Sequence, residues 1–365
     1  MKEKRFYATY SFKAENFKKA KSIAFDICVE QTVEFPFDLI ENEFIKNNFV
    51  GKIEKLKKIN DKYFAKISYH NLTAGLEFTQ FLNVLFGNTS IKKGIKLESF
   101  ELSDYFNSFF KGPRFGINGL RKLLNIYGRP IICSALKPMG LSTENLANLA
   151  LKFASGGIDI IKDDHGLANQ PFSPFKKRVI KVTEKIKKFK TIYTPNITAD
   201  SENEIFKRAY FAKKCGAGGV VISGFLCGIP VVKKLSEDKK FNLPIFFHPA
   251  FMGSFTSDAD SGISHSALYG QLSRLSGADA IIFPNFGGRF SFTKDDCRNI
   301  ISGCKINMGK IKPNLPAPGG GISLENIKNL KNFYGNDVIF LIGGGLFKYS
   351  KDIIKSCQEF KKLIF

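Results

Sequence analysis

The sequence predicts an α/β protein with a carboxyl-terminal (β/α)8 TIM barrel and a smaller amino-terminal α+β domain. From about residue 131, apolar runs alternate eight times with amphipathic, lysine-rich helices, and the connecting loops are rich in Gly, Pro or Asn. Apolar strands that alternate with helices indicate a parallel sheet covered on both faces, and eight such units close into a barrel. The 365 residues suffice for a barrel of about 250 residues and a second unit.

Taken in order, residues 1–110 are interpreted as the small domain, 111–130 as a linker and 131–365 as the barrel. In the small domain, β-rich segments are interleaved with longer helical patterns. The strands expected there are Phe6–Phe12, Gly51–Ile59, Tyr63–Ser68 and Leu97–Leu102, and the helices are Asn16–Gln31 and Leu72–Phe86. The barrel strands expected are Ile131–Leu136, Ile158–Asp164, Thr191–Thr198, Gly219–Phe225, Leu243–Ala250, Ala278–Asn285, Asn314–Pro318 and Val338–Gly343.

Composition narrows the class of protein. The net charge of +22 raises the possibility of nucleic-acid binding, but the lysines are spread along the chain at spacings typical of solvated helix faces. We therefore expect no nucleic-acid partner, and a positive field that favours anionic substrates. No apolar run approaches the roughly 20 residues of a membrane span. The start lacks a signal-peptide core, and the seven cysteines have no C-x-x-C spacing. A cytoplasmic protein with reduced thiols and no membrane association is expected.

The most informative segment is the end of the second barrel strand, where Lys162, Asp163, Asp164 and His165 follow an apolar run. Side chains alternate along a strand, so Lys162 and Asp164 are expected on one face. Asp164 offers oxygen to a divalent cation, Lys162 does so only as a carbamate formed with carbon dioxide, and His165 offers nitrogen. The alternative is a surface cluster in a strand-to-helix loop.

This segment, followed by Gln170-Pro171-Phe172, resembles the large subunit of ribulose-bisphosphate carboxylase (RuBisCO) and, more closely, the non-carboxylating RuBisCO-like (type IV) proteins. The resemblance covers nearly the whole chain and implies a ferredoxin-like amino-terminal domain. It also implies Mg2+ bound by carbamylated Lys162, by Asp164 and by the position of His165, where the family has glutamate.

Further candidates lie at the carboxyl ends of other barrel strands, where barrel enzymes build their sites. By resemblance, Lys137 moves the proton in enolisation and His248 contacts substrate or takes a proton; a structural role for His248 is the alternative. The resemblance also suggests substrate contacts for Asn196, Arg289 and His265.

Two glycine clusters, Gly319-Gly320-Gly321 and Gly343-Gly344-Gly345, follow the seventh and eighth strands. Glycines let backbone N–H groups approach an anion, and these loops are the usual phosphate site of barrels. A phosphorylated small-molecule substrate is therefore expected, and a turn without a ligand is the alternative.

The resemblance also bears on the reaction. The carboxylases' second lysine is replaced by Met139, their closing-loop lysine by Arg289 and a serine by Gly319, which disfavours carbon dioxide fixation. Asn88 stands where the diketo-methylthiopentyl phosphate enolases of methionine salvage carry their base. An isomerase acting by Mg2+-dependent enolisation of a ketose such as 5-methylthioribulose 1-phosphate is expected. A decarboxylase or transcarboxylase of a branched sugar-acid phosphate (a lyase) and a non-catalytic sugar-phosphate-binding relative remain open.

The resemblance also implies an assembly. The family lends the segment that includes Asn83 and Asn88 to the barrel of a partner subunit, which implies a homodimer with shared active sites.

Overall fold

The computed structural model describes residues 5–364, which form two compact units. Of the described residues, the first unit contains 5–111, 252–272 and 306–311, and the second contains 112–251, 273–305 and 312–364. The first unit is discontinuous in sequence, because it combines the amino-terminal region with two later segments of the chain.

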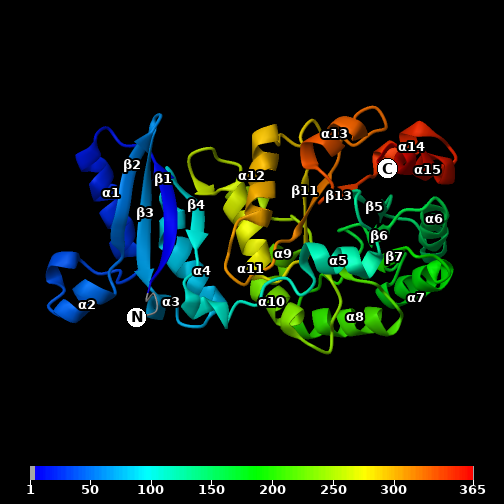
Figure 1. Ribbon diagram of the computed structural model, residues 1–365. Coiled ribbons are helices and arrows are strands. Elements are labelled where there is room, and N and C mark those ends of the chain that lie inside the picture. Colours follow the sequence, from blue (N-terminus) through cyan, green and yellow to red (C-terminus); the bar gives the residue numbers. More distant parts are fainter. Residues whose placement is uncertain (1–4, 365) are drawn as a thin grey trace. The chain divides into compact units, whose positions relative to one another are not determined.

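The first unit is built on a five-stranded sheet with the order β10-β4-β1-β3-β2 (Figure 1). Strands β1 to β4 form antiparallel pairs, and their order along the chain with α1 and α4 gives the βαββαβ arrangement of a ferredoxin-like domain. The elements are β1 (Arg5–Phe12), α1 (Phe17–Glu30), α2 (Glu43–Asn48), β2 (Lys52–Ile59), β3 (Lys62–His70), α3 (Asn71–Ala74), α4 (Phe78–Phe86), β4 (Ile95–Glu101), β10 (Gly262–Ile263) and a π-helix (Ser266–Leu272).

Two features of this unit differ from the sequence expectation. The helix expected over 72–86 is divided into α3 and α4, because Gly75 has a φ of 56°, which interrupts helical geometry. Strand β10 pairs in parallel with β4, although more than 160 residues of chain separate Gly262 from Lys96. Such a two-residue strand carries no periodic signal of its own.

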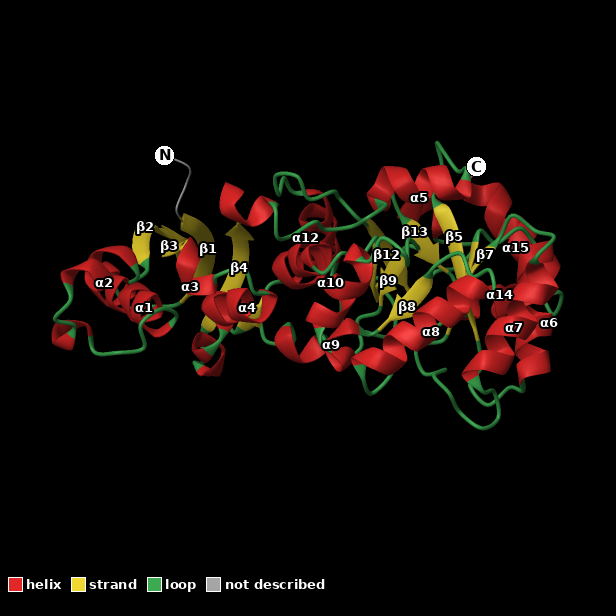
Figure 2. Ribbon diagram, turned by 90° about the horizontal axis from the view of Figure 1, so that it is seen from below, coloured by secondary structure: helices red, strands yellow, loops and turns green. Residues whose placement is uncertain are grey.

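The second unit is an eight-stranded parallel barrel surrounded by helices, as the alternating pattern predicts (Figure 2). The sheet order is β7-β6-β5-β13-β12-β11-β9-β8, and a parallel bridge between Asn196 and Val221 joins the two outer strands. The strands are β5 (Ile131–Leu136), β6 (Ile160–Asp163), β7 (Ile192–Thr194), β8 (Val220–Ile222), β9 (Ile245–Phe247), β11 (Ala280–Pro284), β12 (Leu315–Gly319) and β13 (Ile339–Leu341). The helices are α5 (Gly116–Leu124), α6 (Thr143–Ser155), α7 (Phe175–Ile186), α8 (Glu202–Lys214), α9 (Gly224–Cys227), α10 (Ile229–Glu237), α11 (Ser273–Leu275), α12 (Lys294–Lys305), α13 (Ile327–Tyr334), α14 (Gly344–Tyr349) and α15 (Ile353–Ile364).

Helix α5 lies within the segment interpreted as a linker. Its residues Ile117, Leu120 and Leu124 are buried in one apolar cluster with side chains of the barrel strands. The backbone N–H groups of Phe115 and Gly116 donate to Asp279, directly before β11. Helix α5 therefore packs at the amino-terminal end of the strands and leaves their carboxyl ends to the loops considered below.

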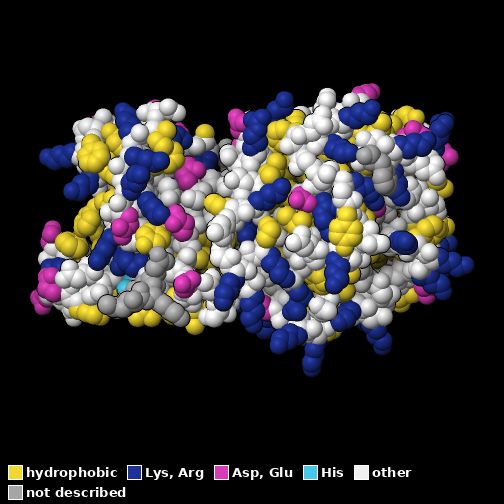
Figure 3. All heavy atoms as spheres, in the orientation of Figure 1, with side chains coloured by type: hydrophobic (Ala, Val, Ile, Leu, Met, Phe, Trp, Pro, Cys, Tyr) yellow, Lys and Arg dark blue, Asp and Glu magenta, His cyan; other side chains and the backbone are white. Residues whose placement is uncertain are grey.

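The surface and the cysteines show how the composition is distributed. On the face shown in Figure 3, Lys and Arg side chains are scattered and interspersed with acidic ones rather than gathered into one band. All seven cysteines are unpaired, and five of them are buried. Within residues 5–364, no helix combines the length and apolar character needed to cross a membrane.

Candidate active site

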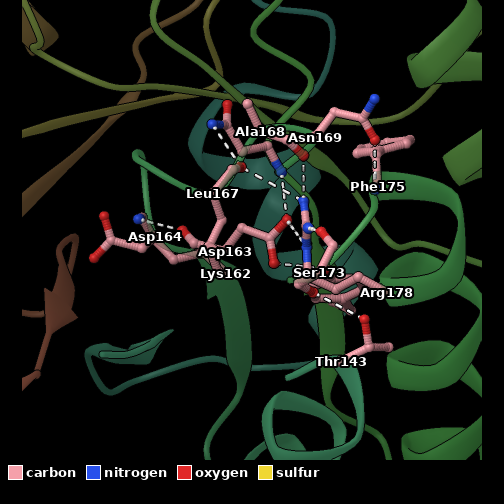
Figure 4. Close-up of polar contacts among 12 residues, drawn as sticks. Thr143, Lys162, Asp163, Asp164, Leu167, Ala168, Asn169, Ser173, Phe175 and Arg178 are labelled. Carbon is pink, nitrogen blue, oxygen red and sulfur yellow. Dashed lines mark hydrogen bonds and ion pairs between the residues drawn. The ribbon is translucent and has the colours of Figure 1, made fainter. Parts of the chain in front are cut away.

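The end of β6 places Lys162 and Asp163 at the carboxyl-terminal rim of the barrel, and Asp164 follows directly after the strand; successive side chains alternate in direction. Ile160 belongs to the apolar cluster inside the barrel, so Lys162, two residues later, points the same way. Lys162 is buried, and its Nζ donates to the backbone carbonyl of Asp163 at 2.7 Å. The Asp163 carboxylate points away from that face and accepts a hydrogen bond from Arg178 of α7 (Figure 4).

Asp164 is the centre of the site. One carboxylate oxygen, Oδ2, lies 2.7 Å from Nζ of Lys137, which follows β5. The other, Oδ1, lies 2.9 Å from Nδ1 of His165 and accepts the backbone N–H of Gly166 at 3.0 Å. Burial alone would raise the pKa of Asp164, but the hydrogen bonds from His165 and Lys137 hold the pKa well below its ordinary value. Asp164 is therefore a carboxylate that fixes two neighbouring side chains.

Lys162 has the environment of a chemically reactive amine. Burial is the largest influence and lowers its pKa from the ordinary lysine value, and the positive charge of Lys137 acts in the same direction. Asp164 and Asp163 act in the opposite direction without cancelling the effect. A lowered pKa increases the fraction of neutral amine, which is the form that adds carbon dioxide to give a carbamate.

His248, directly after β9, lies against this group. Its ring is stacked on that of His165 with a centroid distance of 4.2 Å and an interplanar angle of 8°. Its Nδ1 accepts the backbone N–H of Ala250 at 3.2 Å, which assigns the proton of the neutral ring to Nε2. Burial, followed by the charges of Lys162 and His165, lowers the pKa of His248, so the ring is neutral at physiological pH.

The glycine clusters provide open backbone on the same rim. Gly320 and Gly321 follow β12 with positive φ angles, and a Cβ on Gly321 would lie 2.9 Å from the Cα of Gly288. Apart from the adjoining backbone, no heavy atom lies within 4 Å of a Cβ built on Gly343 or Gly344. A Cβ on Gly345 would lie 2.2 Å from the carbonyl oxygen of Ile322, whereas Gly320 is as open as Gly343 and Gly344. The two loops therefore combine close backbone packing at Gly321 and Gly345 with open space at the other three positions.

Arg289 and Asn196, the two other predicted substrate-binding residues of the second unit, differ in exposure to solvent. Arg289 is exposed in the loop after β11, with its guanidinium 5.0 Å from the ring centroid of Phe290. Asn196 is buried, and its amide donates to the carbonyls of His165 and Leu167 at 2.8 and 3.1 Å. Its Oδ1 accepts from the hydroxyl of Thr198. The side chain of Asn196 thus supports the loop after β6 rather than facing open space.

The remaining predicted residues belong to the first unit. Asn83 is exposed on α4, where its amide is 3.4 Å from the side chain of Gln80. Asn88 donates to Glu30 at 3.0 Å. The ring of His265 stacks on Tyr269 with a centroid distance of 5.8 Å. Their substrate contacts remain predictions.

The residues that hold Asp163 were not identified from the sequence. Tyr193 on β7 donates to its Oδ1 at 2.6 Å, and Arg178 donates to its Oδ2 at 3.1 Å. The alternation of side chains along β6 could have predicted these partners, because it directs Asp163 toward the helix that covers the strand. A carboxylate buried there requires a cation from that helix, and Arg178 is buried in its first turn.

The donor atoms fit a divalent cation. Within residues 5–364, no group of three or more His, Cys, Asp and Glu side chains is placed to hold a metal ion. Asp164 and His165 would offer an oxygen and a nitrogen, and the charge of Asp164 acts on the buried amine of Lys162. A carbamate on Lys162 would complete a set with two oxygen-donating groups, the ligand type that Mg2+ prefers.

Comparison with known proteins agrees with this geometry. Residues 116–355 match the family described as "Ribulose bisphosphate carboxylase large chain, catalytic domain". Ribulose bisphosphate carboxylase-like protein 1 of Rhodopseudomonas palustris is 35% identical over 97% of this chain and 95% of its own length. The 5-methylthioribulose-1-phosphate isomerase of Rhodospirillum rubrum is 34% identical over 94% of this chain and 91% of its own length.

A solved structure extends the likeness to the whole fold. The crystal structure of a Rubisco-like protein from Rhodopseudomonas palustris superposes with a TM-score of 0.88 at 33% identity, covering 99% of this chain and 98% of the other. The family match spans the catalytic barrel, and the relatives span nearly the full length. This chain therefore belongs to the ribulose bisphosphate carboxylase large-chain family, as a RuBisCO-like (type IV) member.

Proposed function

We propose that this protein is an isomerase that moves a proton beside the carbonyl of a phosphorylated ketose, such as 5-methylthioribulose 1-phosphate, without fixing carbon dioxide. The observation that carries this proposal is the contact of Asp164 with both Lys137 and His165 at the barrel rim, within the electrostatic influence of the buried amine of Lys162. The similarity to the Rhodospirillum rubrum isomerase over nearly the whole chain supports the substrate class.

Lys137 is the proposed proton carrier. Its side chain is 42% exposed, so it can reach a bound substrate, while Asp164 fixes its Nζ in direction. A lysine that removes a proton must first be neutral, and transfer of its own proton to substrate or solvent provides that form. His248 offers a second group, because its neutral ring presents Nε2–H as a hydrogen-bond donor.

Lys162, Asp164 and His165 are the proposed ligands of Mg2+, with Lys162 acting as its carbamate. When bound, the ion polarises a carbonyl and lowers the cost of removing the neighbouring proton. The glycine loops after β12 and β13 are proposed to hold the phosphate through backbone N–H groups.

The substitutions noted in the sequence support proton transfer over carboxylation. Met139 and Arg289 stand where the carboxylases have lysines, and Asn88 donates to Glu30 where the enolases have a base. Arg289 keeps a positive charge, but its planar fork differs from the point charge of lysine.

The test is incubation with 5-methylthioribulose 1-phosphate in deuterated water, followed by NMR. Isomerised product supports the proposal. Fixation of labelled carbon dioxide onto ribulose bisphosphate would overturn it, and release or transfer of a carboxyl group from a sugar-acid phosphate would favour the decarboxylase alternative.

A further inference from the structure

Arg178 occupies an unusual position for a charged side chain. It is fully buried on α7, and so is the carboxylate of Asp163 that its Nε contacts at 3.1 Å. A buried guanidinium is stable only when its N–H groups have hydrogen-bond acceptors. The Nε of Arg178 donates to Asp163, and its two Nη atoms donate to other groups. The additional donors go to the loop between β6 and α7, as Figure 4 shows.

These contacts fix the middle and the carboxyl-terminal end of that loop. Nη1 of Arg178 donates to the carbonyl of Ser173 at 2.5 Å, and Nη2 donates to the carbonyl of Ala168 at 2.8 Å. The first contact lies just before α7, and the second lies four residues after Asp164. One rigid, planar group thus joins the helix, the strand end and the loop.

A second arm of the same network comes from β7. The backbone N–H of Asn196 donates to Asp163 at 3.0 Å, while its side-chain amide donates to the carbonyls of His165 and Leu167. The backbone carbonyl of His165 is therefore fixed by the buried side-chain amide of Asn196. Arg178 and Asn196 meet at Asp163, which is adjacent to Asp164 in the chain.

We propose that Arg178 and Asn196 are positioning residues that together hold the segment of Asp164 and His165 in the geometry needed to bind a divalent cation: Arg178 fixes Asp163 and Ala168 on either side of it, and Asn196 fixes the carbonyl of His165. Arg178 lies on the helix that covers the outer face of β6, so it acts through Asp163 and the loop carbonyls and not by contact with the ion or the substrate. This inference rests on the proposed function, because it assumes that Asp164 and His165 are metal ligands there.

The structure offers a matched control at the other end of the barrel. Arg129 and Asp159 form an almost fully buried ion pair through two contacts of 2.7 and 2.8 Å, directly before β5 and β6. Arg129→Lys disturbs a pair of the same chemistry without touching the loop after β6. It therefore reports what a loss of stability alone does to the site.

The experiment measures Mn2+ affinity by electron paramagnetic resonance, with bicarbonate present, in the full-length wild type, Arg178→Lys, Asn196→Ala and Arg129→Lys. Asn196→Ala keeps the Arg178–Asp163 pair, so it provides a result if Arg178→Lys fails to fold. Removing the groups that support metal ligands typically lowers metal affinity about 10–100-fold. We expect a loss of this size in Mn2+ affinity for Arg178→Lys and Asn196→Ala, here called the loop variants because both remove contacts to the loop after β6. The Mn2+ affinity of Arg129→Lys should stay within about threefold of wild type. Loop variants that turn over substrate should lose kcat more than they change KM, because the phosphate loops are intact.

Wild-type affinity in the loop variants, an equal loss in Arg129→Lys, or absence of Mn2+ binding by the wild type would overturn the inference. The Mn2+ titration requires no substrate. A wild type that binds Mn2+ but moves no proton on a ketose phosphate would refute the proposed reaction and leave the role of Arg178 to be decided by the titration.

Discussion

Replacing Gly344 with Asp should remove phosphate binding without disturbing the fold. Gly344 is exposed at the start of α14, its φ is not positive, and, apart from the adjoining backbone, no heavy atom lies within 4 Å of a Cβ built there. A side chain therefore fits without steric strain. Its carboxylate would lie among the backbone N–H groups proposed to hold the substrate phosphate.

The size of the effect follows from Coulomb's law. A carboxylate about 6 Å from a phosphate dianion, with an effective dielectric constant of about 40 for an exposed loop, costs about 3 kcal/mol. That free energy corresponds to a roughly hundredfold loss of affinity. Because Lys137, Lys162 and Asp164 are unchanged, KM should rise by this factor while kcat is retained.

Gly344→Asn is the matched control, since it adds a side chain of nearly the same shape without the charge. Calorimetric titration with substrate, or with inorganic phosphate as a probe, should show weak binding in Gly344→Asp and near wild-type binding in Gly344→Asn. Thermal unfolding should be unchanged in both. Equal affinities in the two variants would show that this loop does not bind the phosphate.

Three further predictions address the metal, the assembly and the core. Lys162→Ala should abolish the carbamate adduct that mass analysis is expected to detect with Mg2+ and bicarbonate, and full activity in this variant would argue against a metal-bound carbamate. If the active sites are shared in a homodimer, mixing Asn88→Ala chains with Lys162→Ala chains should restore part of the activity, whereas a monomeric and fully active protein in solution would contradict sharing. Burial, opposed by three backbone N–H donors, raises the pKa of Asp279 to about 6, above the unfolded value of about 3.9. Folding therefore favours the protonated form of Asp279. The contribution of Asp279 to the free energy of unfolding is largest below about pH 4. It falls by about 3 kcal/mol as the pH rises to about 6, and it is constant above that pH. Denaturant unfolding of wild type and Asp279→Asn across this range should show that difference, and parallel curves would refute it.

The barrel was predictable from the sequence because its strands are short, buried and separated by clear turn signals. Even the weak segment near residue 314 forms β12, although Pro316 and Pro318 lack N–H groups. The N–H of Leu315 points toward β11, where it donates to Asp279, and alternation directs the two prolines toward β13. There the ladder contains only the pair Gly319 and Leu341, so few hydrogen bonds are lost.

The parts that were not predictable depend on tertiary contacts. Helix α5 lies in the segment that the sequence pattern assigns to a linker, because a short apolar stripe cannot be distinguished from a linker until it packs against the barrel core. The stacking of His165 on His248 joins residues 83 positions apart through two loops. The sequence located Lys137, Lys162 and Asp164 at strand ends, but only the structure shows that Asp164 contacts Lys137 and that Asn196 supports the loop.

The central claim, proton transfer by Lys137 on a phosphorylated ketose, is tested most directly by following deuterium from solvent into 5-methylthioribulose 1-phosphate by NMR. The wild type should exchange the proton beside the carbonyl, and Lys137→Ala should lower the rate about 10²–10⁴-fold, as loss of a catalytic acid or base does. Binding of the phosphate should stay nearly intact in that variant. Exchange at the wild-type rate in Lys137→Ala, or fixation of labelled carbon dioxide onto ribulose bisphosphate by the wild type, would contradict the account.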